Sequence, residues 1–531
     1  MVTDRVPVNV DVGGVGLHGC VAMVRGLMRM GWMRRCLAVA ALLASGSAHA
    51  AGTLRFGLDF DFDTFDPARS GSYIERVVNS SLCDQLLNVD ADLNIVPELA
   101  TAWEWSADNL ALAVHLRPGV IFHDGAPMDA EAVRDNIERY RTAAYSNRKV
   151  ELKSVAGVDV VDSLTIRIRL SEPFAPLLAL LANRPGMMLS PRILELGTDA
   201  ITARPVCAGP FRFVERVAQD RVVLERFPGY WNAAAVTLDR IEFRIMPDST
   251  VRLLNLQSGK LDVVNRLAAT DVPTVEAGRG MRVVSSPSIG FEMLSFNLGN
   301  GPAADTPFGR DVRVRQAFAK SIDLVGINQV VFEGRMIPNT QTEPPGTRYW
   351  NPAYPVPARD LAGAKALLAA AGVVRPKLVL SVVNNPTDVQ VGEVIQSMAG
   401  EAGFEVSLRK GESVSQTAAA ARGDYQAYQV IWSGRPDPDG NLSLWMRCGT
   451  ALNWTGWCSK AVEAALDQGA AALDPEARAA AYREATRIYK TDLPYMPLYH
   501  FTWFWGLSDK VQGFAPRPDG LVRPIGVSIR P

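Results

Sequence analysis

The stretch from Leu99 to Tyr140 reads LATAWEWSADNLALAVHLRPGVIFHDGAPMDAEAVRDNIERY and decides the fold. From Leu110 to Leu116, leucine and valine alternate with alanine and histidine, which is the period of a strand that buries one face. Turn dipeptides flank this run at residues 108–109 (Asp-Asn) and 124–125 (Asp-Gly). The pattern predicts a strand at residues 110–116 between two turns.

A helix is expected to follow, opening at Asp129 and running to about Tyr140. Asp129 can cap the helix, since its carboxylate accepts hydrogen bonds from the free N–H groups of the first turn. Glu131 suits the positive end of the helix dipole. Val133, Ile137 and Tyr140 share one face, which we expect to be buried.

This succession resembles the periplasmic solute-binding proteins of ABC importers, family 5, the oligopeptide, dipeptide and nickel type. Their mark is Ala-x-x-Trp, a hairpin strand, Leu-Arg-x-Gly-x-x-Phe-x-Asp-Gly, and a helix opening Ala-x-(Asp/Glu)-Val. The matching segments are residues 100–103, 116–125 and 130–133, with Ala132 in place of the usual acidic residue. The alternative is an ordinary hairpin and helix in some other α/β protein.

Other family motifs extend the resemblance over nearly all of residues 51–531. Residues 205–211 resemble a Gly-x-Gly-Pro-Phe element, with Cys207 in place of the usual small residue. Residues 230–231 match a Tyr-Trp step, and residues 312–317 match a Val-Arg-x-Ala helix. The resemblance implies an α/β fold with two hinged lobes, the type II periplasmic binding protein fold, enlarged by an inserted subdomain.

The same resemblance implies the domain boundaries. Lobe I is expected to comprise residues 51–85, 201–290 and 491–531. The inserted subdomain, residues 86–200, is expected to pack on lobe I, and lobe II is expected to comprise residues 291–490.

Periodicity predicts further elements. Residues 73–87 have a helical pattern, and residues 425–431 have a strand pattern. A strand at 378–383, a helix at 389–402 and a strand at 404–408 form a β-α-β succession, which implies a parallel sheet.

Composition limits the class of protein. The chain has 531 residues, 48% hydrophobic and 21% charged, which is globular but too long for a single core. Its formal net charge is −1, without the concentrated basic surface that nucleic-acid binding needs. We expect two or three domains, a monomer, and no nucleic-acid partner.

Residues 33–50 read as an export signal. Two arginines precede a short apolar core at residues 36–44, and Ala48-His49-Ala50 fits the small-x-small cleavage rule. We expect a Sec-type signal peptide cleaved after Ala50, giving a soluble periplasmic protein. Residues 1–32 precede the signal and are interpreted as a spurious extension from a start codon assigned too early.

Four cysteines lie after the predicted cleavage point: Cys83, Cys207, Cys448 and Cys458. An even number in an oxidising compartment predicts pairing. Cys448 and Cys458 enclose a turn-like segment, and members of the family often have a bridge in this region. Cys83 and Cys207 would then pair by elimination, or else remain as two buried free thiols.

Catalytic and metal-binding patterns find little support. Three histidines follow the signal, His115, His123 and His500, none of them in a known metal-binding spacing, and there is no G-x-S-x-G motif. We expect no enzyme activity, no cofactor and no metal site.

The segment from Val430 to Asn441 is the candidate binding stretch, because it continues a strand into a Gly- and Pro-rich polar loop. In peptide-binding relatives, an Asp three residues after the Trp pairs with the peptide's amino group. Here Arg435 stands three residues after Trp432, which argues against ordinary peptides with a free amine. We expect the solute to contact Trp432, Ser433, Arg435, Asp437 and Phe291. The alternative is a surface turn with solvated charges.

The function implied is that of the solute-binding component of an ABC importer. It would capture a peptide or peptide-like small solute between its lobes and deliver it to an inner-membrane permease. A periplasmic hydrolase is the first alternative, disfavoured because no nucleophile and base occur together. A sensory binding protein that presents its ligand to a receptor is the second, and a neighbouring permease operon would distinguish it.

Overall fold

The computed structural model describes residues 52–530. The predicted signal peptide at 33–50, its cleavage after Ala50 and the extension at 1–32 lie outside the described residues. No helix among residues 52–530 is long and apolar enough to cross a membrane.

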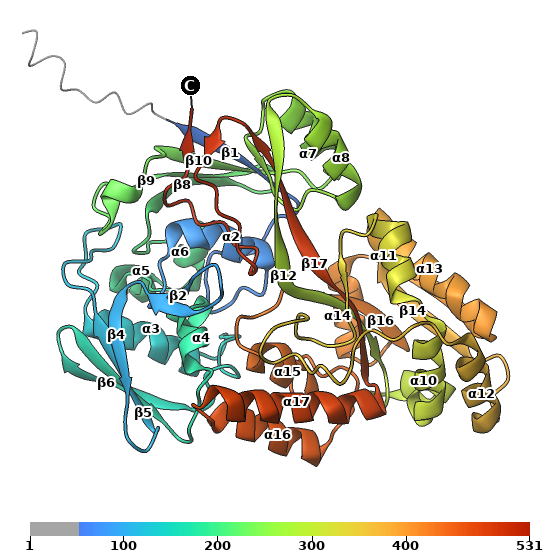
Figure 1. Cartoon of the computed structure of the whole chain (residues 1–531). Coiled ribbons are helices and arrows are strands. Elements are labelled where there is room, and N and C mark those ends of the chain that lie inside the picture. Colours follow the sequence, from blue (N-terminus) through green and yellow to red (C-terminus); the bar gives the residue numbers. More distant parts are fainter. Residues whose placement is uncertain (1–51, 531) are drawn as a thin grey trace, which may run out of the picture. The chain divides into compact units, whose positions relative to one another are not determined.

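The main sheet has eleven strands within the described residues. Its two longest strands, β12 (Met281–Phe296) and β17 (Tyr495–Ser508), are antiparallel neighbours that run side by side through its middle (Figure 1). Beyond β17 follow β11 (Val263–Val264), β1 (Thr53–Leu58), β10 (Arg240–Ile245), β9 (Arg221–Arg226) and β8 (Phe211–Val217). Beyond β12 follow β16 (Ala427–Trp432), β14 (Lys377–Val383) and β15 (Glu405–Gly411), and β13 (Ile337–Pro338) pairs with β17.

A separate sheet of four antiparallel strands contains the stretch that opened the sequence analysis. Its order is β4 (Ala100–Trp105), β5 (Ala111–Leu116), β7 (Thr165–Leu170) and β6 (Val155–Asp162). β5 buries alternate residues, as predicted, but Leu110 precedes the strand and is exposed. The predicted helix is confirmed as α3 (Ala130–Thr142), and Asp129 caps it by accepting a hydrogen bond of 3.0 Å from the Ala132 N–H.

Helices and short strands complete the described chain. The helices are α2 (Tyr73–Leu82), α4 (Leu177–Leu181), α5 (Pro191–Leu196), α6 (Thr198–Ala203), α7 (Ser249–Gln257), α8 (Val272–Ala277), α9 (Pro307–Arg310), α10 (Val312–Ser321), α11 (Leu324–Phe332), α12 (Leu361–Ala371), α13 (Pro386–Ala402), α14 (Ser413–Ala421), α15 (Asp439–Met446), α16 (Lys460–Ala471) and α17 (Pro475–Asp492). Two short pairs of strands are β2 (Leu87–Val89) with β3 (Ile95–Pro97), and β18 (Val511–Gln512) with β19 (Ser528–Ile529).

The apolar core has three clusters. One packs against the main sheet along most of its width. A second draws almost wholly on residues 68–208 and surrounds the four-stranded sheet. The third lies among β12, β16 and helices α15 to α17. The first and third clusters both include residues of β12 and β17.

The predicted β-α-β unit is confirmed. β14 and β15 are parallel, with Lys377 opposite Glu405, and α13 connects them. Gly403 follows α13 with a φ of 102°, a left-handed conformation that glycine adopts without strain and that ends the helix.

The helix predicted at residues 73–87 is shorter than expected. α2 ends at Leu82, because Cys83 is extended and the Leu82 carbonyl accepts a hydrogen bond of 2.9 Å from the Gly209 N–H. The helix is therefore ended by a contact with a residue 127 positions later in the chain, and Leu87 belongs to β2.

The two disulfides expected from the sequence are present. Cys83 is bonded to Cys207, and Cys448 is bonded to Cys458.

Buried carboxyl groups make the stability depend on pH. Burial raises the pKa of Asp84, Glu98 and Glu292 well above the usual range, and raises that of Glu343 to about 7. The folded protein retains carboxyl protons that the unfolded chain has already released. The free energy of unfolding therefore decreases as pH rises. His123 and His500 have pKa values lowered by burial to about 4, so they are uncharged in the folded protein, and in the unfolded chain they lose their remaining charge as pH rises from ~6.5 to ~7.5. Their opposing contribution is smaller than that of the four carboxyl groups. The melting temperature is expected to fall between pH ~6.5 and ~8.

Asp84→Asn tests this pH dependence. Asp84 Oδ2 accepts hydrogen bonds from Tyr230 Oη (2.9 Å) and Trp231 Nε1 (2.8 Å), and the amide oxygen of asparagine can accept both. The variant is expected to show a shallower fall in melting temperature over the same interval, measured by differential scanning calorimetry. A wild-type melting temperature that rises with pH would contradict the assignment.

Candidate functional site

A cavity of about 340 Å³ lies where residues 92–95 and 175–179 meet the loops after β13 and β16. One wall consists of residues 92–95, Ala175, Leu178 and Ala179. The opposite wall consists of Glu343, Pro344, residues 347–349, residues 435–437 and Arg478. Ile289 of β12 also lines it. The cavity thus joins segments that are far apart in the sequence, beside the central strand.

The loop from Trp432 to Asn441 lies close against β12. Gly434 has a φ of 77°, and a Cβ there would stand 2.4 Å from the Ile289 carbonyl oxygen. Only glycine permits this approach, because any side chain would collide with the backbone of β12. The glycine therefore sets the position of the residues that follow it.

Asn441 organises this loop from a fully buried position. Its Oδ1 accepts hydrogen bonds from Trp432 Nε1 (3.1 Å) and from the Arg435 N–H (2.8 Å). Its Nδ2 donates to the Arg435 carbonyl (3.0 Å) and to Glu343 Oε1 (3.1 Å). One amide thus satisfies four groups and joins the two loops of the cavity wall.

Arg435 lines the cavity. Its guanidinium carbon lies 4.3 Å from the centre of the Trp432 ring, and Nη1 donates to the Gly434 carbonyl at 2.8 Å. Ser433 Oγ is 3.4 Å from the same nitrogen. Within residues 52–530, Arg435 forms no ion pair with a carboxylate. Its charge is available to a solute.

Asp437 lines the same cavity but has a partner. Both of its carboxylate oxygens lie 2.9 Å from Arg478 Nη2. The sequence predicted that Asp437 contacts the solute. In the structure its charge is paired with Arg478 of α17.

Of the five predicted contacts, Arg435 and Asp437 line the cavity, and Trp432, Ser433 and Phe291 do not. The Phe291 side chain is 0% exposed and packs edge-to-face on His500, with 5.6 Å between ring centres. It pairs with Trp432 across β12 and β16. In this structure Phe291 belongs to the core behind the loop, because its side of β12 faces the third cluster.

Glu343, Asn441 and Arg478 were missed from the sequence. Asn441 is the last residue of the candidate binding stretch in the sequence analysis. Its position after a Gly- and Pro-rich turn could have indicated that it contributes to the site. Glu343 and Arg478 come from other loops and helices, and neither residue has a local pattern that indicates a site. Burial raises the pKa of Glu343 to about 7, which favours a carboxyl that is partly protonated near neutral pH.

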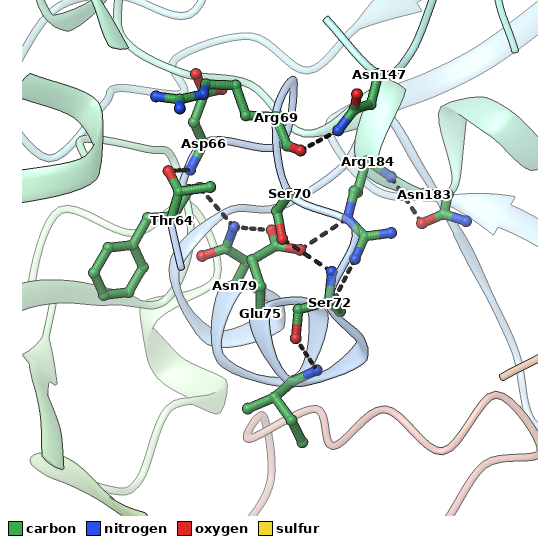
Figure 2. Close-up of polar contacts among 12 residues, drawn as sticks. Thr64, Asp66, Arg69, Ser70, Ser72, Glu75, Asn79, Asn147, Asn183 and Arg184 are labelled. Carbon is green, nitrogen blue, oxygen red and sulfur yellow. Dashed lines mark hydrogen bonds and ion pairs between the residues drawn. The ribbon is translucent and has the colours of Figure 1, made fainter. Parts of the chain in front are cut away.

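A second polar cluster stands at the start of α2, and Figure 2 shows its residues converging. Arg184 Nε donates to Glu75 Oε2 at 2.8 Å, and Arg184 Nη2 donates to the Ser72 carbonyl. Asn79 Nδ2 donates to Glu75 and to the Phe65 carbonyl. The cluster fixes the first turn of α2 in space.

The described residues contain no group of three or more side chains suited to hold a metal ion. His123 accepts a hydrogen bond at Nδ1 from the Cys207 N–H (3.3 Å), and its Nε2 lies 3.1 Å from the Gly209 carbonyl. This histidine supports the disulfide region and does not adjoin the cavity.

Known proteins resemble this chain over most of its length. Glutathione-binding protein GsiB of Salmonella paratyphi A is 28% identical over 497 residues, which cover 91% of this chain and 96% of GsiB. The solved PBP AgaA from A. tumefaciens R10, in complex with agropinic acid, is 26% identical with a TM-score of 0.79, covering 90% of this chain and 99% of AgaA. A dipeptide binding protein from Pseudoalteromonas sp. SM9913, in complex with Met-Leu, is 21% identical with a TM-score of 0.81 over 90% of this chain and 100% of that one, and shows the shared fold.

These matches confirm the fold expected from the sequence, the type II periplasmic binding protein fold. The family model of the bacterial extracellular solute-binding proteins, family 5 Middle, matches residues 94–453, which is more than half of the chain. The chain belongs to the bacterial extracellular solute-binding proteins of family 5.

Proposed function

We propose that this protein captures a peptide-like small solute with an acidic group in the cavity beside β12 and delivers it to the permease of an ABC importer. The observation that carries the proposal is Arg435, a guanidinium that lines the cavity without a carboxylate partner in the described chain. A planar guanidinium donates paired hydrogen bonds that suit a carboxylate. The relatives' ligands agree with this chemistry, since glutathione and agropinic acid are both acids.

Capture would proceed by closure of two lobes. We propose lobe I at residues 51–85, 201–290 and 491–531, the inserted subdomain at 86–200, and lobe II at 291–490. β12 and β17 connect the lobes, and the pairing of β12 with β17 shifts register between Pro287 and Phe291. A solute that touches both walls of the cavity favours the closed state by its differential affinity.

Export and the absence of catalysis complete the proposal. Residues 33–50 would direct the chain to the periplasm through a Sec-type signal, consistent with the two disulfides. We favour a binding protein over a hydrolase because the cavity wall presents no serine, cysteine or histidine set with a nucleophile beside a base. Ligand retained by the purified protein and identified by mass spectrometry would name the solute.

Replacing Arg435 tests the proposed function. Arg435→Ala removes a charge-assisted hydrogen bond worth roughly 1.5–3 kcal/mol, so affinity for the solute should fall about ten- to a hundredfold. Isothermal titration calorimetry against glutathione, amino-blocked peptides, free dipeptides and organic acids measures this loss. Arg487→Ala is the matched control, because Arg487 is exposed on α17 and pairs with Glu484. Unchanged affinity in Arg435→Ala would place the arginine outside the site.

A further inference from the structure

Several buried or partly buried arginines differ in whether a carboxylate pairs with their charge. Four of them have a carboxylate partner: Arg184 with Glu75 (2.8 Å), Arg148 with Glu151 (2.6 Å), Arg523 with Asp519 (2.8 Å) and Arg478 with Asp437 (2.9 Å). Arg76 and Arg435 form no ion pair within the described part of the chain. Arg76 belongs to α2, whereas Arg435 lies in the segment after β16 and lines the first cavity.

Arg76 is a buried cation that forms no ion pair within residues 52–530. Its side chain is 3% exposed, and its Nε and Nη1 are buried with no hydrogen bond in the described structure. The carboxylates nearby are already used, since Glu75 binds Arg184 and Asp519 accepts two hydrogen bonds from Arg523. A buried guanidinium that lacks an anion is costly, and an anionic group of a ligand would offset that cost.

The position of Arg76 is fixed by the segment around it. Tyr73, one turn earlier on α2, donates from Oη to the Gly520 carbonyl at 2.6 Å. Residues 70 and 72, just before α2, accept hydrogen bonds from Arg148 and Arg184. Arg76 is therefore held on a rigid turn, as an anchoring group should be.

Two sets of contacts bring Arg435 to the same region. A second cavity of about 110 Å³ is lined by Arg435 together with Glu151 and Asn183, which stand beside Arg148 and Arg184 in the chain. Ile289, which lines the first cavity, donates its N–H to the Pro518 carbonyl at 3.1 Å, one residue before Asp519. Burial lowers the pKa of Arg435, and the positive charge of Arg76 lowers it further.

We infer that Arg76 and Arg435 form a two-point anchor for a solute with two acidic groups, one group held from each side of the cleft. The inference rests on the proposed function and narrows the proposed solute class to molecules with two acidic groups. A solute with one acidic group leaves one guanidinium unmatched, whereas a dianion matches both and relieves their mutual repulsion. Such an anchor also links recognition to closure, because only the closed state brings both arginines to one solute.

The binding test compares an acid with its ester. The probes are glutathione, which has two carboxylates, and glutathione diethyl ester, which has none. Calorimetry on the wild type, Arg76→Gln, Arg435→Gln and the control Arg487→Gln should show that each site variant weakens glutathione about ten- to a hundredfold. The ester should bind weakly and equally to all four. Equal affinity of the wild type for both probes, or full affinity for glutathione in Arg76→Gln, would overturn the inference.

A ligand-free measurement keeps the inference testable whichever solute is native. Arg76→Met keeps the aliphatic length and removes an unmatched buried charge, so the melting temperature should rise by a few degrees. A lower melting temperature would show that Arg76 is matched by the protein itself, and would overturn the anchor. Tight binding of a neutral dipeptide that is insensitive to Arg76→Gln would leave the proposed importer function standing and refute only the dianion class. If none of the peptides and acids used for calorimetry binds the wild type, the proposal of a peptide-like solute is refuted. The melting temperature of Arg76→Met still tests whether Arg76 is an unmatched charge.

Discussion

Glu75→Gln is expected to lower the free energy of unfolding by about 3–5 kcal/mol, because it leaves Arg184 buried without its counter-charge. Glu75 is 0% exposed and Arg184 is 1% exposed, and the two are joined at 2.8 Å (Figure 2). Asn79 also donates to Glu75, so the variant disturbs two partners at the first turns of α2. Urea denaturation followed by circular dichroism measures the loss.

The double variant Glu75→Gln/Arg184→Met is the control for this prediction. It removes both charges, so it should be more stable than Glu75→Gln alone, although Arg184 also donates to the Ser72 carbonyl. A free energy of unfolding for Glu75→Gln within about 1 kcal/mol of the wild-type value would show that the ion pair does not stabilise α2 as the geometry indicates.

Asn441→Ala is expected to weaken solute binding by about 30- to 1,000-fold. The substitution removes the four hydrogen bonds of the Asn441 side chain and leaves the Arg435 N–H and carbonyl without their partner. Each lost bond costs about 0.5–1.5 kcal/mol, so the loop no longer holds one conformation and the binding-competent fraction falls. Calorimetry with the solute that binds the wild type measures the loss.

Asn255→Ala is the matched control for the loop. Asn255 is a partly exposed residue of α7 whose Nδ2 donates to the Val251 carbonyl within its own helix. It should retain wild-type affinity. An affinity of Asn441→Ala within twofold of the wild type would show that the loop keeps its shape without this amide.

Sequence patterns predicted the strands and helices whose formation depends mainly on neighbouring residues. The strand at β5 and the helix at α3 follow from alternation, capping and one apolar face, all within 42 residues of sequence. The parallel pair β14 and β15 followed from the order of its elements. The extent of α2 could not be predicted, because its end depends on Cys207 and Gly209.

The site was predictable only in part for the same reason. The loop at 432–441 was found because it follows a strand with a Gly- and Pro-rich turn. The role of Asn441 depends on Glu343, 98 residues earlier in the chain, and the partner of Asp437 is Arg478 on α17. The unmatched state of Arg76 is visible only once the partners of Glu75 and Asp519 are known.

Closure on a solute is the central claim, and small-angle X-ray scattering tests it most directly. The radius of gyration should fall when the wild type is saturated with a solute shown by calorimetry to bind, because the solute contacts both walls of the cavity. Arg435→Ala should show the same decrease only at about ten- to a hundredfold higher solute concentration. An unchanged radius of gyration at saturation would contradict capture by lobe closure.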